Sequence, residues 1–155
     1  MTPAELKKLL ADAEQDPKRL AAAVSGVPET ILRNKPAPGK WCIQEIVGHL
    51  ADSELVFAFS FRQLLADKEP KLALIDQDAW AMHLGYMEAS IPELIAQFGL
   101  ERHHNLRVLR RVQMEDLKKS GSHPELGKQV SLAEMIGYWA GHGPNHLAQI
   151  ERLKK

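Results

Sequence analysis

The sequence is poor in the features that mark several common classes of protein. A single cysteine, Cys42, in 155 residues excludes an internal disulfide framework and a cysteine-rich zinc site. The 20 basic and 20 acidic side chains leave no formal net charge, which argues against a nucleic-acid partner recognised through its phosphates. No run approaches the roughly 18 apolar residues of a membrane span, and the start lacks the pattern of a signal peptide. We therefore expect a cytoplasmic protein without a membrane partner.

What the sequence does contain is the composition of one globular domain. Hydrophobic residues make up 45% and charged residues 26%, and the length fits a single domain over 1–155. A chain of this size buries a core without disulfide or metal staples. Seven histidines are its unusual stock of metal-capable side chains, so the search for a site begins with them.

Capping signals and apolar spacing predict helices throughout the chain. Thr2, Ser90 and Ser131 are each followed by Glu three residues later, the pattern of a capping box. Apolar residues then recur every three or four positions over about 3–15 with a continuation to 24, over 42–67, 78–86 and 91–113, and over 132–153. Long connections separate them at 33–40, 68–76 and 118–130, and no run alternates as a strand does. We expect an all-α, antiparallel four-helix bundle with an extra short helix and long connections, either in simple up-down order or with a crossover.

Three histidines have the spacing of a metal site. His142 and His146 are four residues apart, which on a regular helix places both imidazoles on one face. His49 lies on the apolar stripe of the 42–67 helix, where its ring nitrogens need buried partners. Neutral imidazole is a good ligand for zinc, nickel, copper or iron.

The same spacing is also compatible with ordinary structural roles. A core histidine such as His49 is commonly satisfied by a hydrogen bond, and pairs four residues apart arise by chance on surface helices. Pro144 lies between His142 and His146 and removes one backbone hydrogen bond. The helix therefore either kinks at Pro144, which keeps the paired face, or begins there, which removes it.

Two segments carry a family resemblance. The run 40–54, KWCIQEIVGHLADSE, resembles the Trp, Glu and His-Leu-x-Asp-x-Glu signature of the DinB-like superfamily. The run 138–150, YWAGHGPNHLAQI, resembles the closing His-x-x-x-His helix of the same superfamily. Segments 76–81 and 123–127 are similar to the YfiT-like branch of metal-dependent hydrolases and bacillithiol S-transferases.

The resemblance implies a homodimeric bundle that holds one divalent ion, zinc or nickel, through His49, His142 and His146. Three protein ligands leave a coordination position open, as in catalytic zinc sites. Such an ion lowers the pKa of a bound water or holds a bound thiol as thiolate. We therefore expect a hydrolase or thiol S-transferase acting on a small molecule, with a low-molecular-weight thiol as cosubstrate in the second case. The alternatives are a non-enzymatic bundle pinned by its metal, and a metal-free bundle that binds a protein.

Three further residues are candidates for the site. Glu45 lies one turn before His49 and is predicted to orient that ligand or to act as a general base, with a solvated or ion-paired carboxylate as the alternative. Trp80 and Tyr86 are predicted to line the mouth of the substrate pocket, with core packing as the alternative. A basic stretch is interpreted as a solvated helix face or as a patch for carboxylates; it comprises Arg102, His103, His104, Arg107, Arg110 and Arg111.

Overall fold

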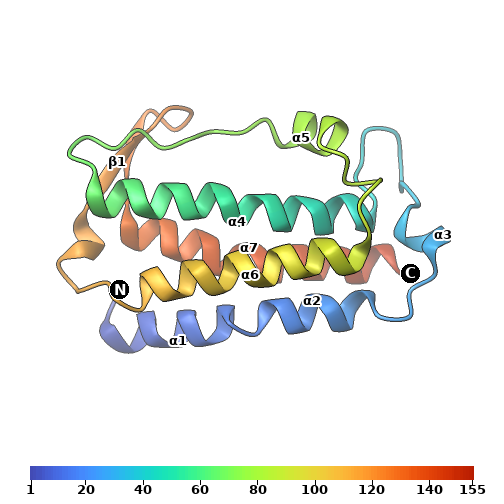
Figure 1. Ribbon diagram of the computed structural model, residues 1–155. Coiled ribbons are helices and arrows are strands. Elements are labelled where there is room, and N and C mark those ends of the chain that lie inside the picture. Colours follow the sequence, from blue (N-terminus) through green and yellow to red (C-terminus); the bar gives the residue numbers. More distant parts are fainter.

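The N-terminal part of the chain forms two helices laid end to end in the computed structural model, which describes residues 1–155 (Figure 1). Thr2 starts α1 (Pro3–Ala13) through the predicted capping box with Glu5. After a two-residue break, α2 (Asp16–Val24) continues in the same direction. The pair forms one row of the bundle, and the short helix α3 (Glu29–Leu32) follows it.

Three long helices form the other rows. They are α4 (Ile43–Ala66), α6 (Ile91–Leu109) and α7 (Leu132–Leu153), with the short helices α5 (Gln77–His83) and η1 (Asp116–Lys118) between them. The predicted capping boxes at Ser90 and Ser131 start α6 and α7. After α4 ends, the connection of residues 67–90 runs back beside α4 to the end where that helix began. Therefore α6 starts at the same end as α4, and the two helices run in the same direction (Figure 1). The predicted four-helix bundle is confirmed, and of its two possible connectivities the structure has the crossover. None of its helices has the length and hydropathy to cross a membrane.

The expectation that the chain contains no strand is wrong. The strands β1 (Ser120–His123) and β2 (Lys128–Ser131) pair as an antiparallel hairpin within the segment predicted to be a plain connection. Strands of four residues are too short to show an alternating pattern, and Gly127 turns the chain at a φ of 59°. A bridge between Lys71 and Ser122 ties the crossover connection to the hairpin beside α4 (Figure 1).

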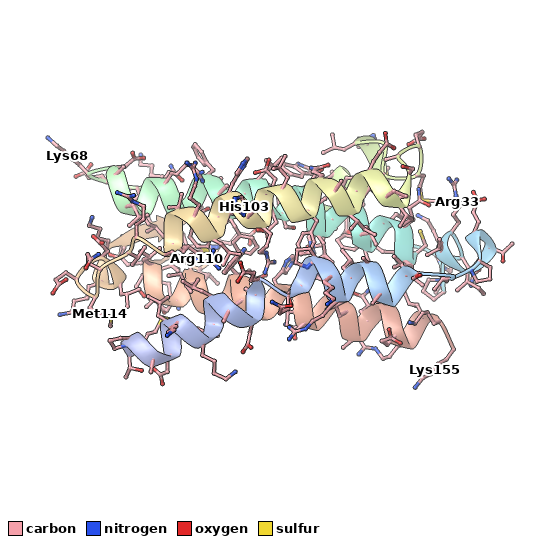
Figure 2. The ribbon with its side chains drawn as sticks, turned by 60° about the horizontal axis from the view of Figure 1, so that its bottom comes forward. Arg33, Lys68, His103, Arg110, Met114 and Lys155 are labelled. Atoms are coloured by element: carbon pink, nitrogen blue, oxygen red, sulfur yellow. The ribbon has the colours of Figure 1, made fainter.

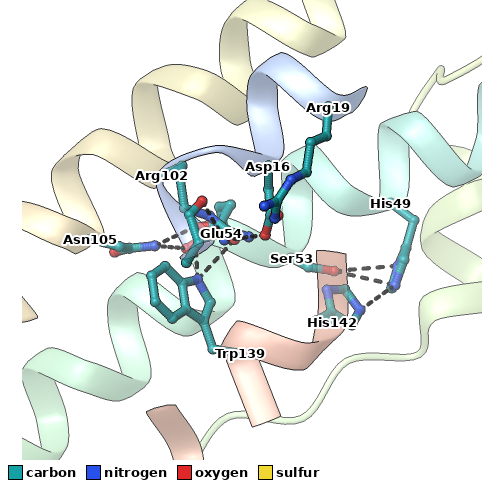
Figure 3. A network of polar contacts seen from close by, with 10 residues as sticks. Asp16, Arg19, His49, Ser53, Glu54, Arg102, Asn105, Trp139 and His142 are labelled. Carbon is teal, nitrogen blue, oxygen red and sulfur yellow. Dashed lines mark hydrogen bonds and ion pairs between the residues drawn. The ribbon is translucent and has the colours of Figure 1, made fainter. Parts of the chain in front are cut away.

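A buried polar network joins all four rows through the core (Figure 3). Arg102 of α6 is 1% exposed and donates to Asp16 of α2 at 2.9 Å and to Glu54 of α4 at 2.8 Å. Trp139 of α7 donates from Nε1 to Glu54 at 2.9 Å, and its ring lies under the guanidinium. Because buried charges persist only with such partners, the network restricts how α4 and α7, which carry the candidate histidines, can pack.

Arg102 is therefore not part of an exposed basic stretch. His103 and Arg110 do lie on the outer side of α6 (Figure 2). Arg110 pairs there with Glu14 at 2.7 Å, so part of the predicted carboxylate patch is already neutralised.

Candidate metal site

The last helix continues through its proline. The helix α7 runs unbroken from Leu132 to Leu153 with Pro144 inside it, so the possibility that a helix begins at Pro144 is wrong. His142 and His146 keep their paired face, and their ring centroids are 4.6 Å apart. Gly143 lets α7 approach α2 closely, because a Cβ there would lie 2.6 Å from the Asp16 carboxylate.

His49 of α4 meets His142 across the bundle (Figure 3) and also contacts His146. Its Nε2 lies 3.1 Å from Nε2 of His142, and its ring centroid is 4.9 Å from that of His146. One nitrogen of each of the three rings lies within 4.8 Å of the other two. The three histidines selected from the sequence thus form one cluster, in which His49 and His142 are 93 residues apart along the chain.

Burial keeps the cluster uncharged. Desolvation, reinforced by the charge of His146, lowers the pKa of His49 to about 4. Desolvation and the neighbouring rings lower the pKa of His142 to about 2, and burial also lowers that of His146. All three imidazoles are therefore neutral near pH 7, which is the state that binds a metal ion.

Hydrogen bonds orient the cluster unevenly. The Nδ1–H of His146 donates to Oε1 of Gln149 at 2.9 Å, which leaves Nε2 with its lone pair free. Ser53 lies 3.4 Å from His49, and Trp41 packs on the same ring with a centroid distance of 4.7 Å. Nδ1 of His142 is buried without any partner. Three neutral ring nitrogens within 4.8 Å of one another are a donor set that fits one divalent ion.

The cluster opens onto a cavity of about 860 Å³. His49 and His142 line it, whereas His146 is not among its lining residues. Its walls are α4, α7, the connection after α4 and the β1–β2 hairpin. A ligand in the cavity could therefore reach the side of the cluster formed by His49 and His142.

Glu45 is held away from this chemistry. Its Oε2 accepts from the backbone N–H of Cys42 at 2.9 Å, and its Oε1 accepts from Lys35 at 2.7 Å. Although burial opposes it, these bonds lower the pKa of Glu45. No hydrogen bond joins it to the histidines, and a catalytic role for Glu45 stays a prediction. The ion-pair alternative describes this carboxylate, which caps the first turn of α4.

Tyr86 and Trp80 do not line the cavity. Tyr86 is 3% exposed and packs on Gly48, where any Cβ would lie 2.4 Å from its ring. Its hydroxyl donates to Asp52 at 2.8 Å, so it anchors the segment after α5 to α4. Trp80 lies in α5, outside the cavity. Tyr86 is thus packed in the core, which was its alternative role, and substrate contacts by Trp80 and Tyr86 stay a prediction.

Several residues of the site were missed from the sequence. Ser53, Tyr138 and Gln149 lie three or four residues from a ligand histidine on the same helix, so the helical spacing that selected the histidines could have found them. The part of the cavity wall formed by the hairpin carries no such local signal. His123, to which no role was assigned, lines the cavity from there.

A helical bundle with a cluster of three neutral histidines beside a cavity belongs to the class of proteins built to hold one metal ion. Residues 12–150 match the family model of the DinB superfamily, DinB_2, and the chain belongs to that superfamily.

Known relatives agree with this assignment. A protein of Bacillus cereus (strain 03BB102) named "Putative metal-dependent hydrolase" is 29% identical over 146 residues, covering 93% of this chain and 82% of its own. A protein of the same description from Bacillus thuringiensis subsp. konkukian (strain 97-27) matches with the same identity and coverage. The solved structure of YfiT from Bacillus subtilis, described as having "an unusual four-helix bundle topology", superposes with a TM-score of 0.93. It is 23% identical and covers 99% of this chain and 87% of its own, so it supports the fold.

Proposed function

We propose that this protein binds one divalent metal ion, zinc or nickel, through His49, His142 and His146 and uses it to hydrolyse a small molecule or to transfer a thiol to one. One observation carries the proposal: three neutral ring nitrogens lie within 4.8 Å of one another, and two of the rings line a large cavity. The names of the Bacillus relatives point the same way.

The residues of the chain have distinct tasks in this proposal. His49 and His142 present nitrogens on the cavity side, and the bond from His146 to Gln149 fixes which of its nitrogens faces the cluster. An ion bound there would supply a Lewis acid that lowers the pKa of a coordinated water or thiol. Phe57 and Tyr138 pack beside His142 and line the cavity with it. A homodimeric state and a cytoplasmic location remain part of the same proposal.

The first experiment measures metal content and its effect on stability. Protein purified with zinc or nickel should contain about one ion per chain and unfold at a higher temperature than chelator-treated protein. A ligand at 100 times its dissociation constant adds about 2.7 kcal/mol of stability, a shift that is readily measured. His142→Ala should abolish both effects, whereas His103→Ala, on the exposed side of α6, should change neither. Metal-free wild-type protein with no response to added ion would contradict the proposal.

The second experiment separates enzyme from metal-pinned module. Panels of amide and ester substrates, and of low-molecular-weight thiols with a generic electrophile, are assayed with and without chelator. Chelator-sensitive turnover lost in His49→Ala supports the enzyme and shows which reaction it performs. The cluster offers no fourth histidine, cysteine or carboxylate, which favours the enzyme over a closed structural site. Stoichiometric metal without any chelator-sensitive turnover would favour the module.

A further inference from the structure

The cavity beside the histidines is long. Along α4 its lining residues extend from His49 to Ser60, and along α7 from His142 back to Glu134. At a rise of 1.5 Å per residue these stretches correspond to about 16 Å and about 12 Å. The histidines lie at one end, and the β1–β2 hairpin, with Leu126 at its turn, closes the other.

The walls between the two ends are apolar along part of their length. Half of the 20 lining residues are hydrophobic, and polar residues such as Ser53, Ser60 and Glu134 lie among them. Val56 and Phe57 contribute from α4, Met135 from α7 and Leu74 from the connection that covers the groove. Apolar walls of this kind favour a ligand with a hydrophobic body.

Two aromatic side chains, Phe57 and Tyr138, lie at the part of the groove next to the histidines. The ring of Phe57 lies 5.5 Å from that of His142, and the ring of Tyr138 lies 5.8 Å from Phe57 and 6.1 Å from His142. Tyr138 remains 66% exposed, so one side of a large aromatic ring is free. A chain leading away from the histidines would meet this pair first.

The histidine end independently points to a ligand. His142 is 9% exposed, lines the cavity, and has a buried Nδ1 without a partner. A buried ring nitrogen of this kind is costly unless something completes its hydrogen bonding or coordination. The polar end and the apolar groove are thus parts of one site.

On the basis of the proposed function, we infer that the substrate is elongated: its reacting group lies at the three histidines and a linear apolar chain runs along the groove to the hairpin. Tyr138 contacts the start of this chain, and Leu126 contacts its end. A compact substrate would use only the histidine end and leave the groove walls without a role.

Straight-chain carboxylic acids test this inference. Butanoate, octanoate and decanoate compete with dansyl-labelled undecanoic acid for chelator-treated protein and for metal-loaded protein, and displacement is followed by fluorescence. Affinity should rise by up to about fourfold for each methylene buried, in both forms of the protein. Metal loading should raise the affinity for every acid by a similar factor, because the carboxylate would bind the ion.

Two groove variants and one matched control locate the chain. Leu126→Ala should lower the affinity for decanoate about threefold or more and leave the affinity for butanoate unchanged. Tyr138→Ala should lower the affinity for every acid. Leu126 and Leu100 are both 57% exposed, but Leu100 lies on α6 outside the groove, so Leu100→Ala should change nothing. All three side chains are exposed, and thermal unfolding checks that each variant is folded.

The outcomes separate this inference from the proposed function. Affinity that does not depend on chain length, or equal effects of Leu126→Ala and Leu100→Ala, would overturn the elongated substrate even if metal strengthens binding. Chain-length dependence sensitive to Leu126 in protein that ignores added metal would support the groove and contradict the metal site.

Discussion

Acidifying the metal-free protein should destabilise it through its buried histidines. The pKa of His49 is about 4 in the folded protein, because burial penalises its charged form, against about 6.5 in an unfolded chain. As the pH falls through about 6.5, His49 becomes protonated in the unfolded chain but stays neutral in the folded protein. Stability contributed by the neutral ring is thus present above pH 6.5 and is lost progressively down to about pH 4.

The size of the loss follows from the two pKa values. Between pH 7 and pH 5, linkage gives about 2 kcal/mol for His49 alone, and a similar amount for His142, whose folded pKa is about 2. A total of about 4 kcal/mol is a large share of the stability of an ordinary domain, roughly 5–15 kcal/mol. Burial raises the pKa of Glu54 and of Asp16, although Arg102 opposes it, so these two carboxyls act in the opposite sense on acidification.

A single variant isolates the contribution of one histidine. Urea unfolding is followed by tryptophan fluorescence at pH 7 and pH 5, in chelator, for the wild type and for His49→Gln, which keeps a polar side chain but does not titrate. Effects of the carboxyls are common to both proteins and cancel in the comparison. The wild type should lose about 2 kcal/mol more than the variant between the two pH values.

The comparison also has a clear contrary result. Equal losses in the wild type and in His49→Gln would mean that the ring is not held neutral by burial in the folded protein. A larger loss in the variant would reverse the sign and refute the reasoning outright. His142→Gln repeats the test from the other helix and should give a difference of the same direction and similar size.

Three further predictions concern the scaffold. Arg102→Met should cost about 3–5 kcal/mol in urea unfolding, because it leaves buried carboxylates without a cation, and a cost below 1 kcal/mol would contradict the network. Gly48→Ala should cost about 1–3 kcal/mol in thermal unfolding, because its methyl group would overlap the ring of Tyr86; an unchanged melting temperature would show that the ring moves freely. Glu45→Gln should lower the free energy of unfolding by about 1 kcal/mol and leave metal affinity unchanged in calorimetry, whereas weaker metal binding would support the role predicted for it.

The helices and the ligands were predictable because both depend on local periodicity. Ser90 and Ser131 start helices through contacts within one turn, and the pairing of His142 with His146 needs only a continuous helix. Glu45 shows the limit of the same rule. It lies on the histidine side of the helix by spacing, yet its carboxylate caps the first turn at Cys42. Helical spacing fixes the face on which a side chain is attached, but it does not fix which of two possible hydrogen-bond partners the side chain contacts.

Parts of the site that come from distant segments gave no local signal. The hairpin closes the cavity because Lys71, on the connection after α4, pairs with Ser122. Neither segment has a sequence pattern that predicts its pairing with the other. Tyr86 is buried because Gly48, 38 positions earlier, leaves room for its ring, and a glycine on an apolar stripe can serve several purposes. Such features follow from which segments meet, and the sequence of one segment does not contain that information.

The burial of Arg102 is a different case, because its signal was present. Phe98, Arg102 and Leu106 are spaced four apart on the core side of α6, and all are at most 2% exposed. An arginine on such a stripe requires a buried opposite charge. Glu54 lies on the core stripe of α4, four residues after Leu50, and has the same requirement. Opposite charges on the core stripes of two helices therefore predict that those helices are neighbours, which is tertiary information that charge counts along one stretch of sequence conceal.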